Sequence, residues 1–288
     1  MKQIVFDCDN TLGVPDCDVD DGLALIYLLG CEKARVHGIT ATYGNSRLDV
    51  VLAAIRKMLK ELGREEITVK AGGAGAGEYE SDAARYLVEM ADRYPGELSV
   101  LATGSLTNLY GAFCLDKHFF EKVKEIVLMG GITAPLVFEK KTMDELNFSC
   151  DPQASAGVLQ NGKNVSVITG NNCLKVLFTK EEYQRVFSES SERIAKYILE
   201  ETDYYFGYNS KDYGIEGFYN WDVTAAVYLM HPELFTDRPK RFAFSREDLK
   251  TGFLREAENG GWQCNLPEIR EAAAFKKNIY DTWLRVKK

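Results

Sequence analysis

Two kinds of apolar pattern alternate along most of the chain. Short, nearly continuous apolar runs are followed by longer segments in which apolar residues recur every three or four positions. Strands covered on both faces give the first pattern, and amphipathic helices give the second. The pattern predicts strands at residues 3–7, 35–42, 66–71, 98–103, 125–131, 164–169 and 238–245.

The segments between the strands predict the helices. We expect them at residues 20–29, 46–62, 81–93, 152–159, 181–206 and 268–286, with one more before residue 125 and another starting at 223. Ser46 and Asp151 are suitable N-caps, and Pro152 suits a first helical position. The alternation predicts an α/β fold with a doubly wound, mostly parallel open sheet and helices on both faces. With no repeat or clear linker, residues 1–288 are expected to form a single domain.

The predicted topology gives the place of a site. Ligands bind doubly wound sheets at the carboxyl ends of the strands. The polar or glycine-containing segments at those ends are Asp7 and Asp9, residues 43–45, residues 103–105 and residues 129–131. We therefore expect four loops, including Asn45, Thr103 and Met129, to converge on one edge of the sheet.

The first of these loops is unusually acidic. Six aspartates lie within fifteen residues: Asp7, Asp9, Asp16, Asp18, Asp20 and Asp21. Carboxylates this close repel one another unless a cation or protons lie among them. Hard divalent metals with oxygen ligands suit such a cluster. The alternative is a solvated loop in which the last two acids favour the positive end of the helix that follows.

The composition limits the kinds of partner that the protein is expected to bind. The formal net charge of −8 predicts that nucleic acid is not bound, because no excess of Lys and Arg is available for phosphates. No apolar run approaches the ~18 residues of a membrane span, and no leader is evident, so a location in the cytoplasm is expected. The seven cysteines have no zinc-like spacing and are expected as free thiols.

Later segments add polar groups to the same edge. Glu145 and Asn147 are expected in an extended segment, pointing the same way. Trp221 and Asp222 directly precede an apolar helix. The glycine-rich segment 72–77 lacks the lysine of a phosphate-binding loop, which favours a close backbone approach there.

These pieces together resemble the inosine-uridine nucleoside hydrolase family. Its members open with Asp-x-Asp-Pro-Gly-x-Asp-Asp after a strand, and the pairs 7–9 and 20–21 are similar to the two halves of that motif. The similarity continues in family order through residues 44–45, 103–108, 127–131, 145–152 and 221–222. It covers about the first four-fifths of the chain.

The resemblance implies a Ca²⁺-dependent hydrolase that releases the base from a ribonucleoside. It implies metal ligands at Asp9, Asp20 or Asp21, the Thr103 carbonyl and Asp222. Asp9 is then the base that takes a proton from water. The ribose and the rest of the substrate would meet Asp20, Asn45, Met129, Glu145, Asn147, Trp221 and Asp222. Relatives are usually dimers or tetramers, so a homodimer or homotetramer is expected.

The sequence departs from the family pattern in three places. The loop between Asp9 and Asp20 is seven residues longer, which leaves Asp16 and Asp18 as alternatives to Asp9 at the metal. Trp221 stands where many members have histidine; stacking on a purine would favour purine ribosides, whereas packing in the core would not. The loop near residues 72–79 is short, and no asparagine is evident for the 5′-hydroxyl.

Two other functions remain open at this stage. Residues 4–12 also resemble the first motif of haloacid-dehalogenase-type Mg²⁺ phosphohydrolases, with Asp7 as nucleophile and Asp9 as acid and base. That function leaves residues 20–21, 145–147 and 221–222 unexplained, and no matching late acidic pair is evident. A Ca²⁺-dependent riboside binder without turnover is the non-enzymatic alternative.

Overall fold

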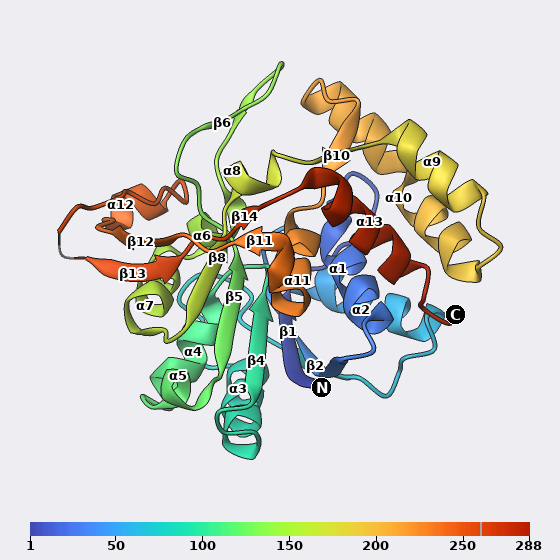
Figure 1. Ribbon diagram of the computed structural model, residues 1–288. Helices are drawn as coiled ribbons and strands as arrows, with labels where there is room; N and C mark the ends of the chain where they lie inside the picture. The colour runs from blue at the N-terminus through green and yellow to red at the C-terminus, as the bar shows by residue number, and fades with distance from the viewer. Residues whose placement is uncertain (260) are drawn as a thin grey trace.

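The computed structural model describes residues 1–259 and 261–288 and contains a twisted eight-stranded sheet (Figure 1). The strand order is β12-β13-β8-β5-β4-β1-β2-β3. Their bounds, from β1 to the last, are β1 Lys2–Cys8, β2 Ala34–Ala41, β3 Thr68–Ala71, β4 Leu98–Ala102, β5 Glu125–Met129, β8 Val165–Ile168, β12 Pro239–Phe242 and β13 Trp262–Asn265. Only β12 is antiparallel to its neighbour; the other paired neighbours are parallel.

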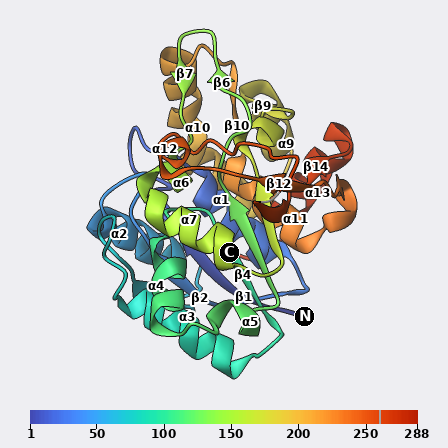
Figure 2. The ribbon, with the colours of Figure 1, turned by 90° about the vertical axis from the view of Figure 1, so that its left-hand side faces the viewer.

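Helices cover both faces of this sheet (Figures 1 and 2). One face carries α1 Asp20–Gly30, α2 Leu48–Glu61, α9 Lys180–Ser188, α10 Arg193–Asp212, α11 Trp221–Met230 and α13 Ala272–Trp283. The other carries α3 Asp82–Arg93, α4 Thr107–Leu115, α5 Phe119–Lys122, α7 Pro152–Asn161 and α12 Arg246–Leu249. The predicted α/β architecture, doubly wound and mostly parallel, is confirmed.

Short elements decorate the carboxyl edge of the sheet. They are the hairpin β6 Leu136–Val137 and β7 Thr142–Met143, the helices α6 Leu146–Cys150 and α8 Gly170–Cys173, the pair β9 Leu177–Thr179 and β10 Gly217–Tyr219, and β11 Phe235–Thr236 with β14 Glu268–Ile269 after the turn η1 Pro232–Leu234. Among the described residues, no helix combines the length and the apolar character needed to cross a bilayer.

Alternation within the strands builds two separate cores. In β1, Ile4 and Phe6 belong to the core beneath α1 and α11, whereas Val5 belongs to the core on the opposite face. Successive strand side chains point to opposite faces, so a strand between two helical layers must be apolar throughout. The first strand is therefore buried from Ile4 to Cys8, where it delivers its aspartates to the sheet edge.

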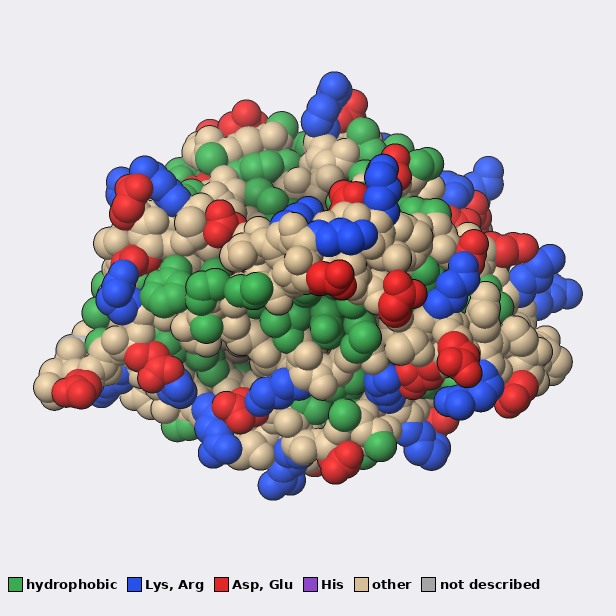
Figure 3. Space-filling view, turned by 90° about the horizontal axis from the view of Figure 1, so that it is seen from above, with side chains coloured by type: hydrophobic (Ala, Val, Ile, Leu, Met, Phe, Trp, Pro, Cys, Tyr) green, Lys and Arg blue, Asp and Glu red, His purple; other side chains and the backbone are tan. Residues whose placement is uncertain are grey.

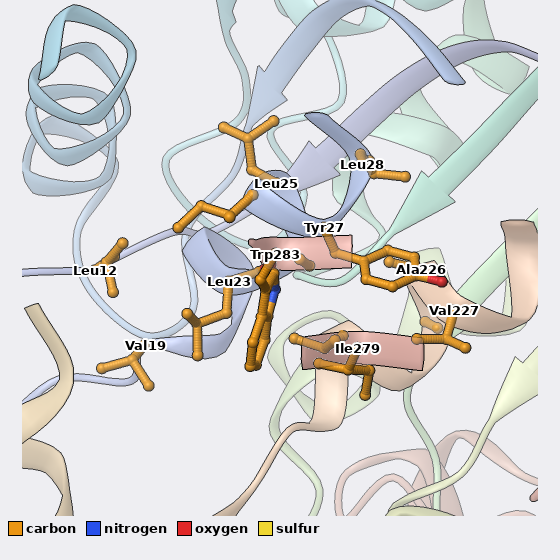
Figure 4. Close-up of a cluster of buried hydrophobic side chains, with 14 of the residues drawn as sticks. Leu12, Val19, Leu23, Leu25, Tyr27, Leu28, Ala226, Val227, Ile279 and Trp283 are labelled. Carbon is orange, nitrogen blue, oxygen red and sulfur yellow. The ribbon is translucent and has the colours of Figure 1, made fainter. Parts of the chain in front are cut away.

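A buried cluster fixes the helices that carry the later aspartates (Figure 4). Trp283 of α13 lies against Leu23 and Ile279, close to Ala226 of α11. Its indole nitrogen donates a hydrogen bond of 2.9 Å to the Leu23 carbonyl, so this large apolar side chain keeps its one polar group satisfied. The cluster ties α1, α11 and α13 together directly below the helix starts that face the sheet edge.

Several predicted elements are wrong in detail. The helix expected at 181–206 is two helices, α9 and α10, separated at residues 189–192. The closing helix begins at Ala272, after the short β14, and not at residue 268. Ser46 does not cap α2, whose N-cap is Arg47 without a side-chain bond. The strand β13 was not predicted, because it is short and has no continuous apolar run.

Two corrections concern the site itself. The segment holding Glu145 and Asn147 is not extended, because Glu145 is the N-cap of α6 and its carboxylate accepts the backbone N–H of Asn147 and Phe148. The helix after the late acid starts earlier than expected, since α11 begins at Trp221 and includes Asp222 in its first turn. The predicted cap of α7 is confirmed: Asp151 accepts from the N–H of Ala154.

Candidate functional site

A cavity of about 350 Å³ opens at the carboxyl edge of the sheet. Its deep end is polar and includes Asp20, Asn45, Asn147 and Asp222, and its outer end is largely aromatic. All ten of the predicted site residues cluster in this region: Asp9 and Asp21 are fully buried next to the cavity, and its lining includes Asp20, Asn45, Thr103, Met129, Glu145, Asn147, Trp221 and Asp222 as well.

Nine of these ten residues were predicted for their side chains, and the tenth, Thr103, for its backbone carbonyl. That carbonyl accepts a hydrogen bond of 3.0 Å from Asn147 Nδ2, and the Thr103 hydroxyl donates to Asp21 Oδ1 at 2.6 Å. The Met129 carbonyl accepts from the same Asn147 amide at 3.1 Å. Asn147 therefore fixes the ends of β4 and β5 relative to each other at the floor of the cavity.

Three buried carboxylates meet at the deep end. Asp20, Asp21 and Asp222 each offer an oxygen, and these oxygens lie within 4.8 Å of one another. The backbone N–H of Asp222 donates to Asp20 Oδ2 at 2.9 Å, which joins the first turn of α11 to the first turn of α1. Two helix starts that are 200 residues apart in the chain thus place their acids around one point, and the partial positive charge of both helix ends favours carboxylates there.

The close approach of these acids costs free energy when all of them are ionised. Burial raises the pKa of Asp21 well above its usual range, and the neighbouring Asp9 and Asp20 carboxylates raise it further. Burial and then Asp20 and Asp21 do the same to the pKa of Asp222. No Lys, Arg or His belongs to the described lining of the cavity, so protein cations do not neutralise the cluster.

Asp9 is a fully buried acid beside the cavity. Its Oδ2 accepts the backbone N–H of Asn45 at 2.5 Å, whereas its buried Oδ1 has no hydrogen-bond partner. A Cβ at Gly44 would overlap this carboxylate, so only glycine allows the approach. Burial raises the pKa of Asp9 to about 6. The buried oxygen without a protein partner marks the side of Asp9 that is available to a ligand.

Asp7 has a different environment on the same strand. Its Oδ2 accepts from Thr40 Oγ1 at 2.6 Å and from Asn108 Nδ2 at 2.9 Å, and burial raises its pKa to about 7. Asp7 does not line the cavity. It connects β1, β2 and α4 beneath the site.

The inserted loop forms part of the cavity rim. Asp16, Cys17 and Asp18 line the cavity, but neither Asp16 nor Asp18 belongs to the cluster of three carboxylates. The loop is held by Thr11 Oγ1, which donates to the Asp18 carbonyl at 2.8 Å, and by the Tyr204 hydroxyl, which donates to the Cys17 carbonyl at 3.0 Å. The extra residues therefore form part of the rim of the cavity. The cluster of three carboxylates that could hold a metal ion forms without them.

Apart from Trp221, the residues at the outer end of the cavity were not predicted from the sequence. Aromatic and apolar side chains from three segments line it: Leu136, Phe138, Met143, Tyr205, Tyr208, Tyr213, Ile215 and Trp221. In Figure 2 the β6–β7 hairpin stands beside α10, and Lys140 Nζ donates to the Ser210 carbonyl at 2.7 Å. A signal for part of this wall was present in the sequence, because Tyr205, Tyr208 and Asn209 have the spacing of one helix face.

Two other sequence features do not contribute to the cavity. The glycine-rich segment packs against the protein instead, with Gly73 N–H donating to Asn108 Oδ1 at 3.1 Å and Gly77 N–H donating to Asp151 Oδ2 at 3.2 Å. None of His37, His118 and His231 is a lining residue. The face in Figure 3 shows Lys and Arg side chains interspersed with Asp and Glu, and no large basic patch.

The donor set fits a hard divalent cation. It consists of oxygen ligands, with three buried carboxylates within reach of one another and a fourth, Asp9, that has an oxygen without a partner. The Thr103 carbonyl retains a second lone pair beside the one used by Asn147. All seven cysteines are free thiols, and only Cys17 borders the cavity, so a thiolate metal centre is not formed there.

Fold and site together define an α/β protein with a mostly parallel, doubly wound sheet and a buried carboxylate cluster at the deep end of its cavity. The family model for inosine-uridine preferring nucleoside hydrolases matches residues 4–263. The chain belongs to this family and is a nucleoside hydrolase, an enzyme that acts on N-glycosyl bonds. The family is metal-dependent, in agreement with the carboxylate cluster.

Relatives by sequence include enzymes described for pyrimidine ribosides. Uridine nucleosidase 1 of Arabidopsis thaliana is 28% identical over 251 residues, which are 77% of this chain and 74% of the relative. The pyrimidine-specific ribonucleoside hydrolase RihA of Salmonella newport (strain SL254) is 26% identical over 264 residues, 81% of each chain.

Solved structures of the same fold cover almost the whole chain. A plant nucleoside hydrolase superposes with a TM-score of 0.86 at 21% identity, covering 98% of this chain and 99% of its own. A purine-preferring ribonucleoside hydrolase from Gardnerella vaginalis gives 0.87 at 20% identity, covering 99% of each. At these identities the likeness establishes the fold.

Proposed function

We propose that this protein is a Ca²⁺-dependent hydrolase that splits ribonucleosides into ribose and free base, with a preference for purine ribosides. The observation that carries the proposal is the meeting of Asp20, Asp21 and Asp222 at the deep end of a cavity whose wall includes Trp221. Carboxylates at one end and an aromatic wall at the other suit a polar sugar joined to a flat base.

The metal would be held by the donors around the cluster: Asp9, Asp20, Asp21, the Thr103 carbonyl and Asp222. When bound, Ca²⁺ lowers the pKa of a coordinated water and binds vicinal hydroxyls of the ribose. Oxygen donors of this kind, including one backbone carbonyl, are typical of Ca²⁺ sites.

Asp9 would take the proton from the attacking water. Its Oδ1 has no protein partner, and its Oδ2 is held by the Asn45 N–H, so the carboxylate is fixed with one oxygen free to accept. The Gly44 backbone leaves room for this position and for no larger residue. Because the Asp9 carboxylate is already held in place, less entropy is lost when the proton acceptor and the water are brought together.

The ribose would lie against the polar residues at the deep end. Asp20 and Asp222 are placed to accept from its hydroxyls, with Asn45, Asn147 and Glu145 completing the sugar pocket and Met129 on the floor. Cleavage of the N-glycosidic bond develops positive charge on the sugar ring, and the surrounding carboxylates stabilise that charge.

The base would lie between the aromatic side chains of the outer end. Trp221 is partly exposed and lines the cavity, so its ring is accessible for stacking on a base. A tryptophan that only packs in the core would be fully buried. A two-ring purine offers the larger stacking area, which is the reason for the purine preference. Pyrimidine ribosides are the second candidate, because the relatives by sequence include enzymes named for them.

The other two functions explain less. A Mg²⁺ phosphohydrolase with Asp7 as nucleophile needs that residue at the cavity, but Asp7 is buried and hydrogen-bonded to Thr40 and Asn108. Phosphate would also meet a wall with carboxylates and without a Lys or Arg among its described residues. A riboside binder without turnover shares the same site and differs only in the measured reaction.

The test is release of base from ribosides by the purified protein with Ca²⁺, compared with the variant Asp222→Asn. We expect the wild type to release base and the variant to lose about 10³-fold or more in kcat/KM, because a carboxylate that meets both metal and ribose is removed. The exposed Asp281, on α13, gives the control: Asp281→Asn removes one charge away from the cavity and is expected to match the wild type.

Three outcomes separate the candidates. Base release that is lost in Asp222→Asn supports the hydrolase. Turnover of a phosphate monoester with Mg²⁺, together with inert ribosides, would establish the phosphohydrolase instead. Riboside binding by calorimetry without any base release would leave the binder.

Assembly and location belong to the same proposal. We expect a homodimer or homotetramer in the cytoplasm, with a small nucleoside as partner and neither nucleic acid nor membrane bound. Support for the exclusion of nucleic acid comes from the net charge of −8. Light scattering of the purified protein measures its mass in solution and tests the assembly directly.

A further inference from the structure

We propose that the site favours a leaving base that already carries a positive charge, so that N-ribosylpyridinium compounds are better substrates than the neutral ribosides, among which purines are preferred. This inference rests on the proposed function and adds the electrostatic class of the leaving base. It follows from three features of the outer cavity: its charge, its lack of a strong proton donor, and the place of Asp18.

The cavity wall carries acids from several separate segments of the chain. Six carboxylates line it: Asp16, Asp18, Asp20, Asp144, Glu145 and Asp222. No Lys, Arg or His is found among the described lining residues. Lys141 lies outside the described lining, although its Nζ is 3.9 Å from the centre of the Tyr213 ring. A positively charged base gains attraction from this wall, and a base that leaves with negative charge is repelled.

The outer end also lacks a good acid for the leaving base. Its hydroxyl donors are phenols, including Tyr208 and Tyr213, and a phenol with its usual pKa near 10 is a poor acid at neutral pH. Burial raises the pKa of both further. A neutral nucleoside therefore has to expel its base with little protonation, whereas a cationic base needs no proton to leave.

Asp18 lies where the two ends of the cavity meet. The pKa of Asp20 at the sugar end is raised by burial and then by the adjacent Asp18 carboxylate. The pKa of Tyr205 at the aromatic end is raised by burial and then by the same carboxylate. Asp18 lines the same cavity as Asp20 and Tyr205, and we place the bond that is cut beside its carboxylate.

The Asp18 carboxylate attracts the positive charge of the substrate both before cleavage and in the transition state. Before cleavage the charge is on the ring nitrogen of the base, and in the transition state it moves to the sugar. The C1′–N bond breaks with its electron pair going to nitrogen, so the pyridine leaves neutral. Water forms the new C1′–O bond and gives one proton to Asp9, which later releases it to solvent. The products are ribose, the neutral base and one proton.

The experiment compares four ribosides at saturating Ca²⁺: the N-riboside of nicotinamide, inosine, uridine and 4-nitrophenyl riboside. Each kcat/KM is divided by the rate of spontaneous hydrolysis of the same riboside, which removes differences in intrinsic lability. For the wild type we expect the normalised value of the pyridinium riboside to exceed those of inosine and uridine by about tenfold or more, or 1.4 kcal/mol.

The variant Asp18→Asn tests the residue. Asparagine keeps the oxygen that accepts the Val19 N–H at 2.7 Å, so the loop retains that hydrogen bond. We expect the ratio of kcat/KM for the pyridinium riboside over the 4-nitrophenyl riboside to fall about tenfold. Asp92→Asn, at an exposed position of α3, removes the same charge outside the cavity lining and is expected to keep the wild-type ratio.

The outcomes keep the two proposals apart. A preference for the cationic riboside that falls in Asp18→Asn supports the inference. Turnover of the neutral ribosides with no preference for the cationic one, or an unchanged ratio in Asp18→Asn, would overturn the inference and leave the proposed function standing. Failure to hydrolyse any of the four ribosides would overturn the proposed function and this inference with it.

Discussion

Trp221 and Asp222 are neighbours in the chain and have separate places in the site. Both lie in the first turn of α11, where successive side chains diverge by about 100°. Asp222 is buried in the carboxylate cluster, whereas Trp221 is partly exposed in the cavity wall, with its ring 5.4 Å from that of Tyr219. One helix start therefore supplies a residue to the metal end and another to the base end.

Replacing Trp221 by alanine is expected to reduce kcat/KM for purine ribosides by about ten- to a hundredfold. The physical reason is the loss of stacking on the base, worth ~1–3 kcal/mol in aromatic contacts with bases. For 4-nitrophenyl riboside, which leaves readily without stacking, a smaller loss is expected. Steady-state kinetics on inosine and on 4-nitrophenyl riboside measure the difference, and equal losses on both would argue against stacking.

At the scale of elements, the sequence predicted the sheet edge well and its surroundings poorly. Strands β1, β2, β4 and β5 end within a few residues of the predicted positions, because a strand buried on both faces is a continuous apolar run. Their carboxyl ends bring together Asp9, Asn45, Thr103 and Met129 as expected. Parallel topology alone is enough to predict that convergence.

The outer wall could not be predicted in the same way. Tyr205 and Tyr208 lie on α10, and their position over the cavity depends on how that helix packs against the inserted loop and the hairpin. Contacts between segments this far apart leave no local pattern. The Glu145 segment was predicted as extended for a related reason: α6 is a single turn of helix, too short to show a helical period.

Helix α6 gives a prediction about pH. Burial raises the pKa of its N-cap, Glu145, from 4.5 to about 7. Because the folded state holds this proton more tightly than the unfolded state, the free energy of unfolding should fall as pH rises from about 4.5 to 7, by ~3 kcal/mol from this group. In Glu145→Gln this contribution is absent, so the variant should lose less stability over that interval.

Urea unfolding at pH 4.5 and pH 7.5, in the absence of divalent metal, measures the two slopes. The exposed Glu65→Gln serves as the matched control and is expected to follow the wild type. Parallel pH dependence of the wild type and Glu145→Gln would contradict the assignment of a raised pKa to this carboxyl.

At the scale of the whole molecule, the carboxylate cluster joins the two ends of the chain. Asp20 and Asp21 come from the first helix, α1, which packs both against α11, the source of Asp222, and against the C-terminal α13. Mutual repulsion at the cluster opposes this packing, and the Trp283 side chain and its neighbours offset the repulsion. A cation bound by the folded state alone should therefore stabilise the entire fold.

Removal of Ca²⁺ with a chelator is expected to lower the melting temperature by about 5 °C or more. At a free metal concentration 100 times Kd the linkage contributes ~2.7 kcal/mol, and a chain of this size shifts by ~2 °C or more per kcal/mol. Differential scanning calorimetry with and without Ca²⁺ measures the shift. Asp222→Asn should show a much smaller shift, and an equal shift in wild type and variant would place the ion elsewhere.

The loop between Asp9 and Asp20 can change in length and charge while the acids at its two ends stay in place. Its two ends are fixed by β1 and α1, and only residues 16–18 of the loop line the cavity. Each doubling of the length of a flexible loop costs only ~0.6 kcal/mol in closure entropy. Segments of different length and charge can therefore be grafted between the same two anchors, so that one reaction can be redirected to new leaving groups while its buried carboxylates stay unchanged.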